Sequence, residues 1–305
     1  MPNSSPSTRC GPISTPRRWP GRSPNFRPGS GALADAEVTA QRNPLGQRIV
    51  TGVVLIIVAL VAVWLGGPAF SALIAAATLI MFTEWAVMHR LGRGTRLAGL
   101  VLLAGVLVVI QLATPGEAVV ALSGGAGLIW LFAARMQKGA GSWAAAGLLY
   151  AGLPALALIW VRGLPLGLPA TVFLLVCVWS ADIVAFFTGR AIGGPKLAPA
   201  ISPNKTWSGA IGGIVGAMVI GGGLAAVYLA SLGGIKAGYF FGLAGGLAAL
   251  SVLGDLLESG LKRRAGVKDS GNILPGHGGV MDRLDGLVPV AVAGAAVFAA
   301  TGWAG

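Results

Sequence analysis

Residues 209–230 read Gly-Ala-Ile-Gly-Gly-Ile-Val-Gly-Ala-Met-Val-Ile-Gly-Gly-Gly-Leu-Ala-Ala-Val-Tyr-Leu-Ala and contain no charged side chain. About 20 apolar residues are enough for a helix to cross the hydrocarbon layer of a membrane, which is roughly 30 Å thick. This stretch is apolar on all sides, as are residues 51–65, whereas a strand that crosses a membrane alternates apolar and polar positions. The pattern therefore predicts membrane-spanning helices and excludes a β-barrel.

The rest of the chain has the same apolar character. Hydrophobic residues make up 55% of the 305 positions, charged residues make up 10%, and the mean hydropathy is +0.78. We therefore predict an all-α, polytopic membrane protein with about nine transmembrane helices. The expected spans are residues 50–65, 68–88, 96–113, 118–134, 143–161, 169–189, 209–231, 238–260 and 286–303.

The distribution of basic residues predicts how these spans are oriented. With nine spans, fifteen lysines and arginines fall on one side of the membrane and only Arg162 and Lys236 on the other, leaving out the five distal arginines of the amino-terminal tail. Loops rich in Lys and Arg stay in the cytoplasm, so we expect a cytoplasmic amino terminus and an inner (plasma) membrane location. The fifteen are Arg42, Arg48, Arg90, Arg93, Arg96, Arg135, Lys138, Arg190, Lys196, Lys205, Lys262, Arg263, Arg264, Lys268 and Arg283.

Residues 1–41 differ from the rest, because they are rich in Pro, Ser, Gly and Arg and show no apolar periodicity. Such a segment cannot bury enough apolar surface to offset its chain entropy. It also lacks the apolar stretch and cleavage site of a signal peptide. We expect residues 1–41 to form a disordered cytoplasmic tail and residues 42–305 to form one membrane-embedded domain.

The net charge of +12 bears on the partners of the chain. The basic residues lie at the ends of apolar runs, so membrane lipids and phosphorylated substrates are favoured and a nucleic-acid partner is not expected. The two cysteines, Cys10 and Cys177, provide neither a disulfide framework nor a metal-binding spacing. Glycines four residues apart, such as Gly209 and Gly213, favour close packing within the chain over a dimer contact.

Charge is concentrated near the carboxyl end, in residues 259–285, with Asp255 and Glu258 directly before them. A carboxylate inside a bilayer costs at least about 2.5 kcal/mol, so these carboxylates need a partner, a cavity or an ion. This region is therefore the first candidate for a functional site. Its eight charged residues are Lys262, Arg263, Arg264, Lys268, Asp269, Asp282, Arg283 and Asp285.

Two pairs of carboxylates in this region are spaced three residues apart, Asp255 with Glu258 and Asp282 with Asp285. On a helix this spacing places both members on one face, where they repel. A Mg²⁺ ion relieves such repulsion, because it binds one or two protein carboxylates together with phosphate oxygens. The alternatives without a metal are a helix cap at Asp282 and an ion pair between Glu258 and Lys262.

A glycine-rich turn, Pro-Gly-His-Gly-Gly at residues 275–279, lies between the basic and the acidic residues. Glycine N–H groups can approach an anion closely, and the span that begins near Gly286 offers a helix amino terminus. We expect a phosphate site here, in which His277 either takes part or is a plain turn residue.

A second polar segment, residues 182–209, is expected on the same side of the membrane. It contains Asp182, Arg190 and the sequence Ser-Pro-Asn-Lys-Thr at residues 202–206. Its basic residues suit a polyphosphate or a lipid phosphate. The alternative is that Ser202 and Thr206 only cap the helix that follows.

These two segments resemble the phosphatidate cytidylyltransferases, also called CDP-diacylglycerol synthases. The family signature joins Ser-x-x-Lys-Arg, Lys-Asp, the Pro-Gly-His-Gly-Gly turn and Asp-Arg-x-Asp, and every gap is as expected here. An upstream element is similar as well, but this chain has Ser208 where the family usually has Glu. Residues 48–52 and Glu84-Trp85 look like earlier landmarks of the family.

The resemblance implies that CTP and phosphatidate react to give CDP-diacylglycerol and pyrophosphate. It further implies a homodimer and a Mg²⁺ ion, with a monovalent cation such as K⁺ as a second candidate, bound by Asp255, Asp282 and Asp285. The expected catalytic residues are Lys262, Arg263, Lys268, Asp269, His277, Asp282, Arg283 and Asp285. The expected substrate-binding residues are Asp182, Arg190, Ser202, Lys205, Thr206, Ser259, Gly278 and Gly279.

Two other functions compete with this interpretation. Another membrane nucleotidyl- or phosphotransferase, with a polyprenyl or sugar acceptor, is separated from it by the motif match alone. An ion- or proton-coupled transporter would also explain carboxylates within spans, such as Asp182. A transporter, however, has no need for a loop of metal and phosphate ligands, whereas the joining of two phosphates depends on positioning and charge neutralisation.

Overall fold

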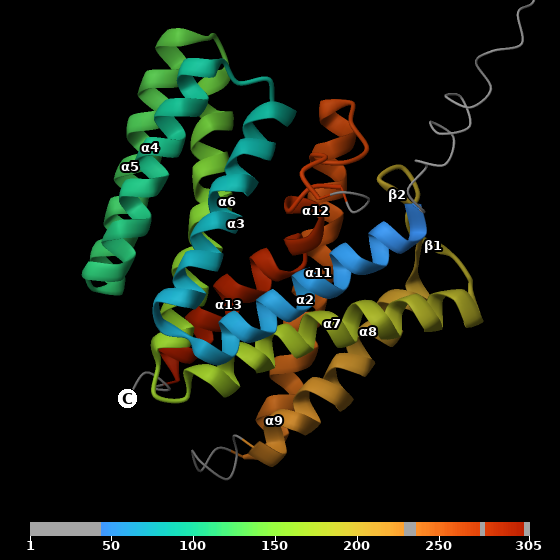
Figure 1. The fold of residues 1–305 in the computed structure, drawn as a ribbon. Coiled ribbons are helices and arrows are strands. Elements are labelled where there is room, and N and C mark those ends of the chain that lie inside the picture. Colours follow the sequence, from blue (N-terminus) through green and yellow to red (C-terminus); the bar gives the residue numbers. More distant parts are fainter. Residues whose placement is uncertain (1–43, 229–235, 275–277, 302–305) are drawn as a thin grey trace, which may run out of the picture. The chain divides into compact units, whose positions relative to one another are not determined.

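The computed structural model describes the backbone of residues 44–228, 236–274 and 278–301, and side chains from residue 50 (Figure 1). Its amino-terminal half consists of α2 (Pro44–Leu65), α3 (Gly67–Met88), α4 (Arg93–Leu112), α5 (Pro115–Met136), α6 (Ala140–Gly163) and α7 (Gly167–Ile192). Two strands follow, β1 (Lys196–Ala198) and β2 (Ser202–Thr206). The remaining helices are α8 (Trp207–Ala217), the π-helical turn η1 (Met218–Gly222), α9 (Gly223–Tyr228), α11 (Ala237–Ala265), α12 (Met281–Leu284) and α13 (Leu287–Ala300).

Seven helical segments of the described chain are long and apolar enough to cross a membrane. One of them, Trp207–Tyr228, is the continuous run of α8, η1 and α9. Two further apolar helices, Val50–Leu65 and Leu287–Ala300, are shorter. The chain is therefore a largely helical, polytopic membrane protein, as predicted, and a helix lies within each of the nine stretches expected to span. The expected tail, residues 1–41, lies outside the described residues.

The interior is built from two groups of buried apolar side chains. The first joins α3, α4, α5 and α6 and contains the fully buried Phe82, Leu103 and Leu148. The second joins α6, α7, α11 and α13 around Leu174 and Phe240. Many large apolar side chains of α2 and α7 are instead exposed, which suits surfaces that face lipid. Helix α6 contributes to both groups and connects them.

Glycines permit the close approach of α7 and α8. A Cβ atom added to Gly213 would lie 2.7 Å from the carbonyl oxygen of Ala181, and one added to Gly209 would lie 3.0 Å from that of Ala185. Real Cβ atoms essentially never approach another heavy atom to 2.7 Å, and 3.0 Å is unusually tight, so these glycines permit the close crossing of the two helices. The predicted use of Gly209 and Gly213 in packing within the chain is confirmed. At Gly242, by contrast, nothing in the described structure lies within 4 Å of an added Cβ.

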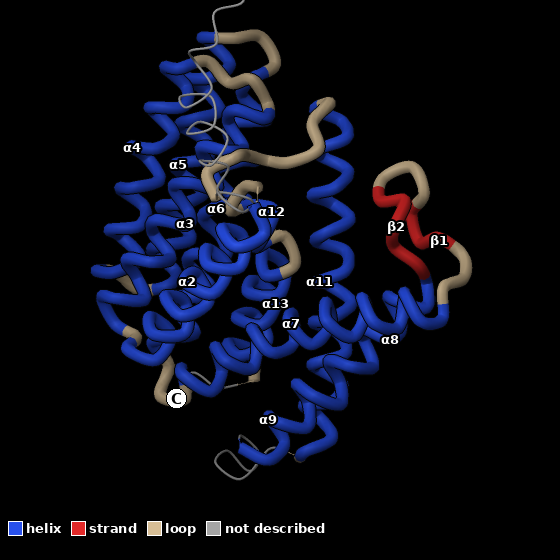
Figure 2. The backbone as a smooth tube through the Cα atoms, turned by 45° about the vertical axis from the view of Figure 1, so that its right-hand side comes forward, coloured by secondary structure: helices blue, strands red, loops and turns tan. Residues whose placement is uncertain are grey.

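A short antiparallel hairpin departs from the expected all-α fold. Strands β1 and β2 pair with Lys196 opposite Thr206 and Ala198 opposite Ser202. Figure 2 draws this hairpin in red, between α7 and α8. The strands have three and five residues and include a proline, so they carry none of the apolar alternation by which strands are predicted.

Candidate active site

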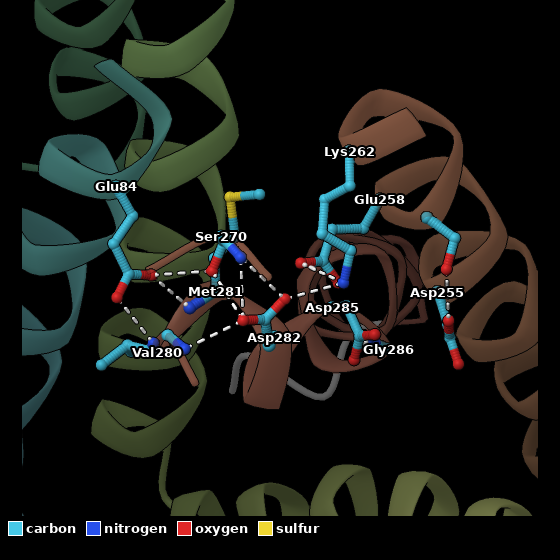
Figure 3. A network of polar contacts seen from close by, with 12 residues as sticks. Glu84, Asp255, Glu258, Lys262, Ser270, Val280, Met281, Asp282, Asp285 and Gly286 are labelled. Carbon is cyan, nitrogen blue, oxygen red and sulfur yellow. Dashed lines mark hydrogen bonds and ion pairs between the residues drawn. The ribbon is translucent and has the colours of Figure 1, made fainter. Parts of the chain in front are cut away.

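The candidate site lies at the carboxyl-terminal part of α11, on the loop that follows it and on α12. Helix α11 has 29 residues, more than the about 20 that a span requires. Asp255, Glu258, Ser259 and Lys262 are three or four residues apart and therefore lie on one face of this helix. Figure 3 shows this face beside Asp282 of α12. The Glu84 side chain of α3 lies on the other side of Asp282.

Asp282 is surrounded by hydrogen-bond donors. Lys262 donates from Nζ to Oδ1 over 2.7 Å, and the backbone N–H groups of Ser270 and Gly279 donate to Oδ2 over 3.0 and 2.9 Å. Burial alone would raise the pKa of Asp282, but these hydrogen bonds outweigh it and hold the pKa below its ordinary value. Asp282 is therefore a fixed, ionised carboxylate at neutral pH.

Lys262 connects two carboxylates. Besides Asp282, its Nζ lies 3.3 Å from Oε1 of Glu258, and the Glu258 side chain is 0% exposed. Although this distance allows ion pairing, neither carboxylate oxygen of Glu258 has a hydrogen-bonding partner among the described residues. Glu258 is a buried carboxylate that shares Lys262 with Asp282 and lies beside Asp285, so a further positive charge would be favourable there.

Asp255 connects α11 to the hairpin. Its Oδ2 forms an ion pair with Nζ of Lys205 in β2, and its Oδ1 accepts a hydrogen bond of 3.3 Å from Ser259. A second contact runs alongside, because Nε of Arg263 donates to the carbonyl oxygen of Ile201 over 3.4 Å. The two polar segments predicted to act together are thus in direct contact.

Asp285 follows α12 and has a different environment. Its Oδ1 accepts a hydrogen bond of 2.8 Å from the backbone N–H of Gly286. Burial raises the pKa of Asp285 above its ordinary value, and the negative charge of Asp255 raises it further. The four carboxylates Asp255, Glu258, Asp282 and Asp285 thus lie close enough for the negative charge of one to act on another.

The three aspartates predicted to bind a metal do not form a ready ligand cluster. Among the residues described, no group of three or more His, Cys, Asp or Glu side chains is arranged to hold a metal ion. Asp255 and Asp282 are each paired with a lysine instead. The donor type and the charge nevertheless suit a hard divalent cation, because all four carboxylates offer oxygen ligands, and the ion pairs found in the described part of the chain bring two lysines, Lys205 and Lys262, to them.

The sequence is similar to a known family and to named bacterial proteins. Residues 46–301 match the model of a family described as the cytidylyltransferase family. The chain belongs to the cytidylyltransferase family. A Brucella abortus protein named phosphatidate cytidylyltransferase is 46% identical over 255 residues, which cover 81% of this chain and 90% of that protein. A Pseudomonas aeruginosa protein of the same name is 35% identical over 285 residues, covering 85% of this chain and 98% of the relative.

The structure also locates the other residues expected of a cytidylyltransferase. Thr206 is the amino-terminal cap of α8, because its Oγ1 accepts a hydrogen bond of 3.1 Å from the Gly209 N–H. The capping alternative is therefore confirmed for Thr206, while Ser202 begins β2. Gly278 has a positive φ of 80°, a conformation that favours glycine. Exposed positions are occupied by Asp182, Arg190, Arg263, Lys268, Asp269 and Arg283, and His277 lies outside the described residues.

Three polar residues near the site were not predicted to take part in cytidylyl transfer. Glu84 was a family landmark and a carboxylate within a span but was given no role in the site, and Ser270 gave no signal because a serine in a polar loop is unremarkable. Tyr150, in α6, has a buried hydroxyl without a hydrogen-bonding partner in the described structure, and the charges of Glu258 and Asp285 act on it. The position of Glu84 within an apolar span was the signal in the sequence, since a carboxylate in a span needs a partner, and in the structure its relative exposure is 3%.

Proposed function

We propose that this protein transfers the cytidylyl group of CTP to phosphatidate, producing CDP-diacylglycerol and pyrophosphate. The observation that carries this proposal is the family match over residues 46–301, which includes both polar segments of the site. The names of the Brucella and Pseudomonas relatives support the same reaction. The contact between Lys205 and Asp255 adds support, because it brings the two segments into one site.

In this reaction a phosphate oxygen of phosphatidate attacks the α-phosphorus of CTP. The new P–O bond forms as the bond from the α-phosphorus to the bridging oxygen breaks, and pyrophosphate leaves. No protein nucleophile is needed, so the residues act by positioning and by neutralising charge. Arg263, Lys268 and Arg283 are exposed around the site and suit the phosphates, and the glycines Gly278 and Gly279 suit a close backbone approach to an anion.

We propose Mg²⁺ as the cofactor, held by Asp255, Asp282 and Asp285, with a monovalent cation such as K⁺ as an additional candidate. When bound, Mg²⁺ supplies positive charge to phosphate oxygens. The chain's own part is to keep Asp282 ionised, through Lys262 and the N–H groups of Ser270 and Gly279. The buried carboxylate of Glu258, which shares Lys262 with Asp282, supports the need for additional positive charge at this place.

We also propose nine membrane crossings, with the amino terminus and the active site on the cytoplasmic side of the inner membrane. The support is the strong bias of lysines and arginines toward one set of loops. Within this arrangement residues 42–305 form the catalytic domain, residues 1–41 form a disordered tail, and the protein acts as a homodimer. Cysteine labelling from each side of sealed vesicles would test the orientation.

The reaction is tested with the purified protein in detergent micelles containing phosphatidate and CTP labelled at its α-phosphate. We expect label in a lipid product that depends on both Mg²⁺ and phosphatidate, whereas CTP labelled at the γ-phosphate should yield labelled pyrophosphate. Product with a polyprenyl phosphate but not with phosphatidate would favour the other transferase. Absence of any lipid product, together with ion-dependent uptake into liposomes, would favour the transporter.

A further inference from the structure

Glu84 lies in the last turns of α3, yet all its described hydrogen bonds go to the segment around α12. Its Oε1 accepts a hydrogen bond from the N–H of Val280 over 2.9 Å, and its Oε2 accepts one from the N–H of Met281 over 2.8 Å. The hydroxyl of Ser270 lies 3.2 Å from the same Oε2. A carboxylate in an early span thereby holds the start of the short helix that carries Asp282 (Figure 3).

Ser270 links Glu84 to Asp282. Its Oγ is 3.2 Å from Oε2 of Glu84 and 3.0 Å from Oδ2 of Asp282, while its backbone N–H also donates to Asp282. A hydroxyl has one proton and can donate to only one acceptor at a time. The two carboxylates therefore share this donor, and a change in the position of one affects the hydrogen bonding of the other.

The fit around Glu84 is close because glycines surround it. A Cβ atom added to Gly279 would lie 2.7 Å from Oε2 of Glu84, and one added to Gly271 would lie 2.8 Å from Oε1. At Gly271 and Gly279 the loop thus approaches the carboxylate with its backbone alone. Because Gly279 also donates its N–H to Asp282, the same turn serves both acidic side chains.

We propose that Glu84 and Ser270 are positioning residues for cytidylyl transfer, which set the orientation of the Asp282 carboxylate without contacting the substrates. This inference rests on the proposed function. Without Glu84, the N–H groups of Val280 and Met281 lose their acceptor, although Met281 is buried. Buried donors without partners are unfavourable, so the turn would adopt other conformations and Asp282 would no longer be held in one orientation.

The test uses the full-length protein in detergent with Glu84→Gln and Ser270→Ala. In Glu84→Gln an amide NH₂ replaces one of the two acceptors, so one backbone N–H meets a donor. We expect kcat to fall by about 10- to 100-fold, KM for phosphatidate to stay within about threefold, and the half-saturating Mg²⁺ concentration to rise. Ser270→Ala should change the same quantities in the same direction by about 3- to 10-fold. If Glu84→Gln fails to fold, Ser270→Ala tests the proposal in its place.

Thr83→Val is the matched control, because Thr83 is the neighbour of Glu84 and its hydroxyl bonds only within α3, to the Leu79 carbonyl oxygen. This variant should keep the activity of the parent. A double-mutant cycle then separates positioning from folding. In an Asp282→Asn background, Glu84→Gln should cost less than about threefold, since the carboxylate that it orients is already lost.

Hydrogen–deuterium exchange provides a readout that needs no activity. Glu84→Gln should speed exchange in residues 278–287 and leave α5 and α7 unchanged. Parent-like kcat with unchanged exchange there would overturn the proposal, as would faster exchange throughout the chain with a lowered unfolding temperature. If the parent made no CDP-diacylglycerol, the proposed function would fail, whereas local exchange effects would still support the positioning of Asp282.

Discussion

Lys205 of β2 forms an ion pair with Asp255 of α11, fifty residues further along the chain. The pair joins the hairpin to the helix that carries Asp255 and Glu258. Its side chains are 28% and 30% exposed, so water screens the interaction and its contribution to stability is roughly 0–1 kcal/mol. The importance of this contact therefore lies in the placement of charge at the site.

Lys205→Met should accordingly separate activity from stability. We expect kcat/KM for CTP to fall at least about tenfold, because a cation that we propose to bind the substrate phosphates is lost. The thermal unfolding midpoint should change little. Lys236→Met, an exposed lysine just before α11, is the control and should behave like the parent. Activity of Lys205→Met equal to that of this control would argue against a role for Lys205.

Asp282→Asn should abolish most activity without preventing insertion into the membrane. An Asn side chain has one acceptor oxygen, so its NH₂ must face Lys262 or the N–H groups that now bind Oδ2. We expect kcat to fall by at least about two decades, as is typical when a charge-stabilising group is lost. Steady-state assays and size-exclusion profiles should be compared with those of Asn272→Ala, an exposed change in the same loop. Normal turnover by Asp282→Asn would refute the metal assignment.

Ser208→Glu, which restores the residue usual in the family, is not expected to increase activity in this chain. The Ser208 hydroxyl donates to the carbonyl oxygen of Gly193, at the end of α7, and a glutamate cannot make that bond. Ser208→Ala should cost about 1 kcal/mol of unfolding free energy, the usual contribution of one hydrogen bond. Activity assays and thermal melts of both variants would check this, and a gain of activity in Ser208→Glu would mean that serine is a deficit here.

Gly213→Ala should destabilise the protein through the contact between α7 and α8. The added methyl group would meet the Ala181 carbonyl oxygen at 2.7 Å, and overpacking of this kind costs about 1–3 kcal/mol. Gly242→Ala is the matched control, because no atom of the described structure lies within 4 Å of its added methyl group. Thermal unfolding in detergent should show a lower midpoint for the first variant alone. A similar loss in Gly242→Ala would indicate a contact with a second chain.

The helices were predictable because apolar runs of this length have few alternatives to crossing a membrane. Carboxylates near the ends of spans pointed to the region of the candidate site, since buried charge needs partners. The pairing of Lys205 with Asp255 could not be predicted from the sequence, because Arg190 and Lys196 of the same segment also carry a positive charge. Only the tertiary fold determines which cation reaches which carboxylate.

The hairpin and the Glu84 contact mark the limits of pattern-based reasoning. The short strands pair through their backbones, which leaves no periodic signal in the side chains. Glu84 was recognisable as a charge in a span, but its partners are backbone N–H groups of a distant loop. Backbone donors are the same at every residue other than proline, so the sequence cannot indicate which of them an acid will meet.

The distance along the chain between Glu84 and Met281 has a consequence for biosynthesis. The two residues are 197 positions apart, and ribosomes add about 5–20 residues per second. Once α3 has entered the membrane, its carboxylate must therefore wait on the order of 10–40 s before the N–H groups that satisfy it have been translated. A nascent chain interrupted before residue 270 therefore carries an acid for which none of the donors in the described structure has yet been made.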